Sequence, residues 1–170
     1  MDDPLTGVII IIVLLILNGL FSAAETAIVA SRKSKIKELL RKRKDRKTEM
    51  LLSLKENPER FLSTVQIGIT LFGTLASAVG GLMAVKHIMP VIARVEFLKP
   101  FAESIAVAIV VCILTYLFIV FGELVPKYLG LSYKERAALA VLPFFNLVSR
   151  VFSIFVNFLS VTTLFLVKTL

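Results

Sequence analysis

The strongest constraint on this chain is a run of 27 residues, Pro4 to Ala30, that holds a single charged side chain, Glu25. As an α-helix this run would be about 40 Å long, which exceeds the roughly 30 Å hydrocarbon core of a bilayer. The residues before it, Met1-Asp2-Asp3, are acidic, whereas a signal peptide begins with a basic region. We therefore expect a membrane-spanning helix that is retained in the mature protein.

Composition excludes most soluble classes of protein. Hydrophobic residues make up 57% of the 170 residues, and the mean hydropathy is +0.87. One core of this size could not bury so much apolar surface, so a soluble enzyme, a disulfide scaffold and a disordered tail are all excluded. Cys112 and His87 are the only residues of their types, which leaves no intrachain disulfide and no nucleophile–base pair. We expect no enzyme activity.

Two further apolar segments, residues 61–85 and 104–121, are also long enough to span a bilayer. The connection between them, residues 86–100, contains Pro90, Pro100 and charges of both signs. The sequence therefore predicts an all-α integral membrane protein with three transmembrane helices.

The basic residues are concentrated between the first and second spans. Residues 31–60 hold 12 of the 20 Lys and Arg side chains and only five acids. A basic loop between apolar segments indicates the cytoplasmic side, and the absence of interleaved aromatic residues argues against nucleic-acid binding. Apolar residues recur here at helical spacing, so we expect short amphipathic helices whose cations face lipid headgroups.

The last apolar stretch, residues 137–167, allows two interpretations. Its length fits a fourth span, which would put the C-terminus outside. Four residues that are costly inside a bilayer interrupt it: Pro143, Asn146, Arg150 and Asn157. A helix lying in the inner leaflet tolerates them better and would keep the C-terminus cytoplasmic. Hydropathy alone favours neither interpretation.

Polar and small residues form stripes on the first two spans. Asn18, Ser22 and Glu25 share one helix face because they are spaced four and three apart. The second span carries a longer stripe at the same spacing: Gln66, Thr70, Gly73, Ser77 and Gly80. Small residues allow helices to approach closely, so the stripe predicts a packing seam, in which Gln66 and Thr70 could instead bond a neighbouring backbone carbonyl.

Two carboxylates in apolar surroundings require an explanation, because a charged side chain at the bilayer centre costs roughly 2.5–3.5 kcal/mol. Glu25 lies close enough to the basic loop to pair with Arg32 or Lys33 at the inner interface. Glu123 is preceded by a long uncharged run, and its structural explanation is an ion pair with Lys127 one turn later.

A functional explanation of Glu123 involves Pro126. Proline has no N–H and clashes with the carbonyl four residues earlier, here that of Gly122. A freed carbonyl beside an acid is how membrane proteins build cation sites in interrupted helices. Hard cations such as Mg²⁺ prefer oxygen ligands, so this segment is a candidate cation site.

Three stretches together resemble a known family. Residues 18–27 (NGLFSAAETA), 58–71 (PERFLSTVQIGITL) and 122–127 (GELVPK) are similar to the transmembrane domain of the cyclin M/CorC divalent-cation transporters, once labelled hemolysins. The resemblance implies a homodimer in the plasma membrane, with an outer N-terminus and a cytoplasmic C-terminus. It also implies cytoplasmic juxtamembrane helices, a belt helix over residues 137–167, and an ATP-binding pair of CBS domains after residue 170.

The resemblance also implies a dehydrated Mg²⁺ site formed by Ser22, Glu123 and the Gly122 carbonyl. Many members carry asparagines where this chain has Ile69 and Gly73. The remaining oxygen donors suggested by the sequence are Gln66, Thr70 and, less directly, Glu25.

The implied function is Mg²⁺ transport, as efflux and with possible Na⁺ exchange. The alternative is a membrane sensor or scaffold that transmits the state of the CBS domains without transporting an ion.

Overall fold

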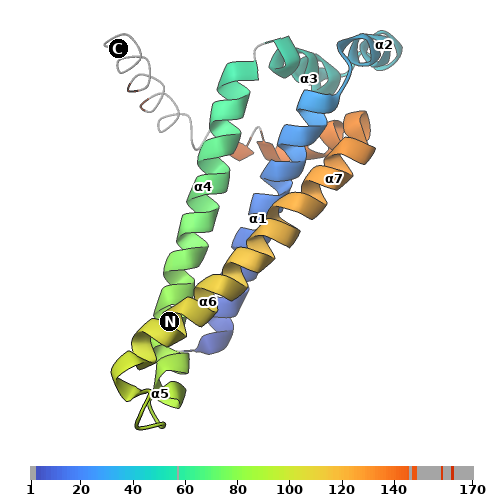
Figure 1. The fold of residues 1–170 in the computed structure, drawn as a ribbon. Coiled ribbons are helices and arrows are strands. Elements are labelled where there is room, and N and C mark those ends of the chain that lie inside the picture. The colour runs from blue at the N-terminus through green and yellow to red at the C-terminus, as the bar shows by residue number, and fades with distance from the viewer. Residues whose placement is uncertain (1–2, 57, 146, 149–157, 159–161, 163–170) are drawn as a thin grey trace, which may run out of the picture. The chain divides into compact units, whose positions relative to one another are not determined.

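The computed structural model describes residues 3–56, 58–145, 147–148, 158 and 162. These residues form helices joined by short turns, and no β-strand occurs among them. In chain order the elements are α1 (Pro4–Ala30), α2 (Lys33–Arg43), α3 (Arg46–Glu56), α4 (Pro58–Met83), η1 (Ala84–Ile88), α5 (Met89–Ile92), η2 (Lys99–Phe101), α6 (Ala102–Ile119), η3 (Val120–Leu124) and α7 (Val125–Ser132). Figure 1 labels the α-helices. The predicted all-α fold class is confirmed.

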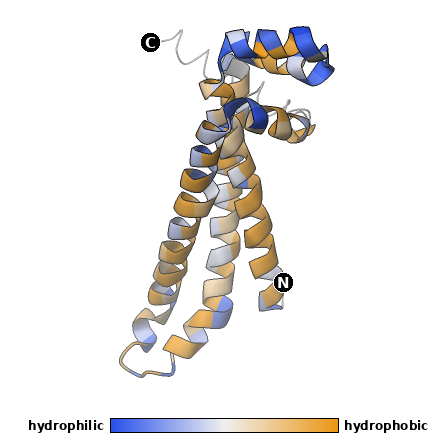
Figure 2. Ribbon diagram, turned by 90° about the vertical axis from the view of Figure 1, so that its right-hand side faces the viewer, coloured by the Kyte–Doolittle hydropathy of each residue, from blue (hydrophilic) through white to orange (hydrophobic). Residues whose placement is uncertain are grey.

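Among the described residues, three helical stretches are long and apolar enough to cross a membrane: Pro4–Ala30, Phe61–Ile92 and Lys99–Ser132. They contain the three predicted spans, but the second and third are longer than expected, at 32 and 34 residues. The π-helical turns η1 and η3 let the chain continue as a helix beyond residues 85 and 121. Figure 2 shows that hydrophobic residues cover most of these helices and that hydrophilic residues concentrate in α2 and α3.

The chain divides into two compact units, and each is described by itself. The first unit comprises residues 1–19 and 70–125, and the second comprises residues 20–69 and 126–170. Helices α1 and α4 contribute to both units, because the division falls within each of them.

Small residues bring the helices of the first unit close together. A Cβ atom on Gly80 of α4 would overlap Leu114 of α6, and one on Gly7 of α1 would overlap Met83 at the end of α4. By contrast, a Cβ on Gly73 or Gly81 would meet nothing within 4 Å. The predicted stripe on the second span is therefore only partly an intrachain seam, since Gly80 packs inside the protomer and Gly73 faces open space.

An aromatic cluster organises the second unit. The Phe21 ring of α1 meets Phe144 edge to face, with ring centroids 5.5 Å apart. Phe61 of α4 lies 4.9 Å from Phe145 between centroids. Residues 134–145 are helical, so the described beginning of the last apolar stretch packs against α1 and α4. Most of residues 146–167 lie outside the described residues, and the choice between a belt and a fourth span concerns those residues.

An ion pair joins the basic helices α2 and α3, and hydrogen bonds join α3 to the end of α1. Lys33 and Glu56 form an ion pair of 2.8 Å between α2 and α3. The Lys55 ammonium donates to the carbonyls of Ile28 and Val29, at 3.3 and 2.6 Å. These carbonyls belong to the last turn of α1, where the helix dipole favours a cation.

Helices α1 and α7 approach backbone to backbone in the second unit. A Cβ on Gly130 of α7 would lie 2.7 Å from the Ala23 carbonyl oxygen and 3.2 Å from the Ala27 nitrogen of α1. Backbone atoms cannot move aside as the end of a flexible side chain can, so this contact requires glycine.

The close contact gives a test of the fold. Gly130→Ala should lower the free energy of unfolding in detergent by about 1–3 kcal/mol, because the added methyl group forces α7 away from α1. Gly81→Ala is the matched control and should leave stability unchanged or slightly raised, since its Cβ enters open space. Equal effects of the two substitutions in thermal or denaturant unfolding would contradict the packing described.

Candidate cation site at the third membrane helix

A π-helical turn marks the segment around Glu123. In η3 the Val125 N–H donates to the carbonyl of Val120, five residues earlier, instead of four. The next residue, Pro126, has no N–H to offer, so the carbonyl of Gly122 lacks its usual helical donor. Single π-turns inserted into α-helices are found frequently at functional sites.

The Gly122 carbonyl receives its hydrogen bond from another helix of the first unit. The Asn18 side chain of α1 donates from Nδ2 to this oxygen at 2.9 Å, in a buried position. A Cβ on Gly122 would lie only 3.0 Å from Asn18 Nδ2 and 3.1 Å from Leu15, so glycine is what allows the helices to come this close. The carbonyl that Pro126 leaves without a helical donor is thereby held by a side chain.

The other end of the same amide is unsatisfied. Asn18 is only 3% exposed, and its Oδ1 atom is buried with no hydrogen-bond partner among the described residues. Leaving a buried acceptor unpaired costs about 1–3 kcal/mol, and an amide oxygen is a ligand that hard cations accept. The spacing in the sequence puts Asn18 on the polar face of its helix but does not identify it as a ligand. The four-residue spacing from Ser22 was the available signal.

The remaining candidate ligands differ in how deeply they are buried and in which of the two compact units they belong to. Glu123 is partly exposed and Thr70 is exposed, and both belong to the first unit. Ser22 is fully buried and belongs to the second unit, where Gln66 is exposed. The structure thus joins Gly122 to Asn18 directly, while Ser22 and Gln66 are described with the other unit.

Glu25 lies near a cation from α7 in the second unit. Its Oε2 atom is 4.0 Å from Lys127 Nζ, and the two side chains are 29% and 36% exposed. Arg32 and Lys33 are the partners that the sequence suggests for Glu25, whereas in the structure Lys33 forms an ion pair with Glu56 of α3. A partly exposed pair at this distance contributes little stability.

The charge available for a cation is small. The described residues contain no group of three or more His, Cys, Asp or Glu side chains that could hold a metal ion. A cation here would meet one carboxylate, that of Glu123, and otherwise neutral oxygens.

The sequence matches the family described as the cyclin M transmembrane N-terminal domain over residues 9–170. The chain belongs to this family. It is 42% identical over 153 residues to a UPF0053 protein of Synechocystis, covering 90% of this chain and 34% of that protein. It is also 30% identical over 148 residues to the polyamine export protein of Haemophilus influenzae, covering 85% of this chain and 33% of the relative.

Membership in the family confirms the resemblance drawn from the three motifs and supports a transporter role in a multi-pass membrane protein. The polyamine export protein of Escherichia coli is 28% identical over 138 residues, with 81% of this chain and 30% of the relative covered. The chain therefore spans about a third of the length of these relatives.

The contact between Asn18 and Gly122 can be tested without any ligand. Asn18→Asp replaces the Nδ2 donor with a second oxygen, so two acceptors face each other in a buried place. With a chelator present, the free energy of unfolding should fall by about 1–3 kcal/mol.

Ser77→Ala is the control for this measurement. It removes a hydroxyl that bonds only to its own helix, at the Gly73 carbonyl, and should change stability little. Unchanged stability of Asn18→Asp would show that Nδ2 does not support the Gly122 carbonyl.

Proposed function

We propose that this chain is the membrane domain of a cation exporter whose binding site is built around the π-turn of the third span. The observation that carries this proposal is the buried Asn18 Oδ1 atom, which has no hydrogen-bond partner among the described residues and belongs to the amide that holds the Gly122 carbonyl. A bound cation would satisfy this oxygen, and Glu123, the next residue after Gly122, would supply the negative charge.

Mg²⁺ is the first candidate cargo. It takes oxygen ligands in near-octahedral geometry, and the ligands that we propose within the first unit are Asn18, the Gly122 carbonyl and Glu123. Ser22 belongs to the second unit and stays a candidate ligand through the family resemblance alone. We consider three other residues less suitable as ligands: Thr70 and Gln66 are exposed, and Glu25 lies beside Lys127. One carboxylate offsets only half of the charge of a divalent ion, so the site would bind weakly enough to release its cargo, as transport requires.

A polyamine is the second candidate cargo, and two observations favour it. Two relatives described above are polyamine export proteins by name. In addition, this chain has Ile69 and Gly73 at the two positions where the family resemblance leads us to expect asparagines. Fewer amide ligands suit an ammonium group better than a small dehydrated metal ion.

The relatives named for export also support outward transport. The remaining parts of the proposal are a plasma-membrane location, an outer N-terminus, a cytoplasmic C-terminus, possible Na⁺ coupling and ATP-binding CBS domains in a longer chain. The concentration of cations in residues 31–60 supports this orientation. The alternative function, a sensor without transport, would need no oxygen-lined site beside Glu123.

Glu123→Gln tests the site directly. It keeps the shape of the side chain and removes its charge, so the cation-induced rise in melting temperature should disappear, as should flux in vesicles. A ligand at 100 times its Kd stabilises the folded state by about 2.7 kcal/mol, which is an easily measured shift. Ser22→Ala removes one neutral oxygen and should weaken both signals, whereas Glu25→Gln should change them little.

Parallel measurements with Mg²⁺ and spermidine identify the cargo. A Glu123-dependent shift and flux with only one of them assigns that cation. If Glu123→Gln retains the full shift and flux with both, Glu123 is a structural residue and the cation site lies elsewhere.

Homodimerisation belongs to the same proposal, and the open face of α4 supports it. In the first unit, small or polar residues of this helix are exposed or face open space: Thr70, Gly73, Thr74 and Ser77. Small residues of this kind are typical of contacts between helices in a membrane. A second copy of the chain would cover this face.

Gly73→Leu should weaken the dimer, because a branched side chain prevents the close approach of the two α4 helices. The protomer itself should fold normally, since the added atoms enter space that is open within one chain. Cross-linking or light scattering in detergent measures the oligomeric state, with Val91→Leu at an exposed position of α5 as a control. A normal dimer in Gly73→Leu would show that this face contacts lipid.

A further inference from the structure

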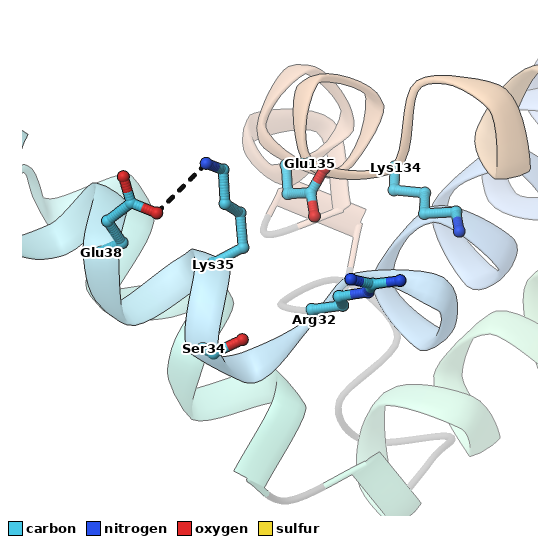
Figure 3. Close-up of a pocket in the computed structure, with 6 residues that line it drawn as sticks. All are labelled: Arg32, Ser34, Lys35, Glu38, Lys134 and Glu135. Atoms are coloured by element: carbon cyan, nitrogen blue, oxygen red, sulfur yellow. Dashed lines mark hydrogen bonds and ion pairs between the residues drawn. The ribbon is translucent and has the colours of Figure 1, made fainter.

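A pocket of about 460 Å³ lies at the start of α2, within the second unit. Two segments line it, the beginning of α2 and the beginning of the helical residues 134–145, as Figure 3 shows. The lining residues are Arg32, Ser34, Lys35, Glu38, Lys134 and Glu135. None of them takes part in the proposed cation site.

The charges of the pocket are only partly matched inside the protein. Glu38 accepts hydrogen bonds from Lys42 at 2.7 Å and from Lys35 at 3.1 Å, and these lysines hold its pKa below the usual value. Within the described residues, no carboxylate lies within ion-pair distance of Arg32 or Lys134. Glu135 is the other acid of the pocket. Three cations, Arg32, Lys35 and Lys134, therefore face two carboxylates, and the pocket keeps an excess of positive charge.

The start of α2 adds to this excess. Arg32 occupies the N-cap position, no side chain caps the helix there, and the first turn contains no acid. Cations at a helix N-terminus oppose the helix dipole, so the arrangement is unfavourable without an anion. An anion in the pocket would contact Arg32, Lys134 and the free N–H groups in the first turn of α2 at the same time.

The position of the pocket along the chain indicates the source of the anion. Arg32 follows the last residue of the first membrane span, Ala30, by two positions, which places it at the level of the lipid headgroups. Exposed apolar side chains adjoin both walls in sequence: Val29 on one side, and Leu131 and Tyr133 on the other. A charged pocket with apolar borders suits a phosphate that carries acyl chains better than a free one.

We propose that this pocket binds the phosphate group of an anionic phospholipid from the leaflet on the side of α2 and α3. Arg32 and Lys134 bind the phosphate oxygens, and the Ser34 hydroxyl donates a further hydrogen bond. The bound headgroup would link the end of α1, the basic helix α2 and residues 134–145. This proposal does not depend on which cation is transported.

The test uses the intact protein, purified in a neutral detergent and titrated with phosphatidylglycerol, with bound lipid counted by native mass spectrometry. Removing both cations by Arg32→Gln and Lys134→Gln should weaken binding roughly 10- to 30-fold, because each Lys or Arg near a membrane surface contributes about 1 kcal/mol. The matched control is Arg41→Gln with Lys47→Gln. It also removes one arginine and one lysine charge, but from exposed positions of α2 and α3, and should have little effect on lipid binding.

Glu135→Gln supplies a change of the opposite sign. It removes an acid from the pocket and should tighten phosphatidylglycerol binding severalfold, which a general loss of folding could not produce. Lys134→Gln alone provides a variant with a small structural effect if the double variant folds poorly.

Two results would overturn the proposal. An equal loss of binding in the pocket variant and the control would show diffuse attraction to the basic surface. If inorganic phosphate raises the melting temperature as much as phosphatidylglycerol does, and only when Arg32 and Lys134 are present, the ligand is a soluble phosphate and the lipid assignment is wrong.

Discussion

In an apolar medium every backbone carbonyl must find a donor within the protein, and in this chain Pro126 removes the donor that the Gly122 carbonyl would have had. The Asn18 amide supplies the missing hydrogen bond from another helix. That hydrogen bond brings α1 against the third span and requires glycine at position 122. It also leaves the buried Asn18 Oδ1 atom with no partner in the part of the chain that the structure describes. The candidate cation site is a consequence of satisfying one carbonyl.

In the second unit, the carbonyls at the C-terminal end of α1 also need hydrogen-bond donors. The last carbonyls of this helix have no intrahelical donors, and Lys55 of α3 binds two of them. The Lys33–Glu56 pair then holds α2 beside α3. As a result, the basic helices have defined positions next to the membrane span, and their cations can line a pocket instead of forming only a diffuse positive surface.

The spacing of glycines in the sequence does not show which of them pack closely against another helix. The stripe on α4 reads as one seam in sequence, yet Gly80 packs against Leu114 while Gly73 faces open space. Gly130 carries no special signal in the sequence, and it is the residue that allows α7 to meet the backbone of α1. Which glycine is required depends on what lies opposite, and helical periodicity does not specify that.

The sequence by itself determined the three spans, the basic helices between the first two, the family and the importance of the Gly122–Pro126 segment. These features follow from local properties: apolar length, charge density and the missing N–H of proline. Only the tertiary structure decided that Asn18 holds Gly122, that Glu25 lies beside Lys127, and that Arg32 and Lys134 share a pocket. Each of these pairs joins residues about 100 positions apart, and such pairings depend on how the helices pack, which no local pattern encodes.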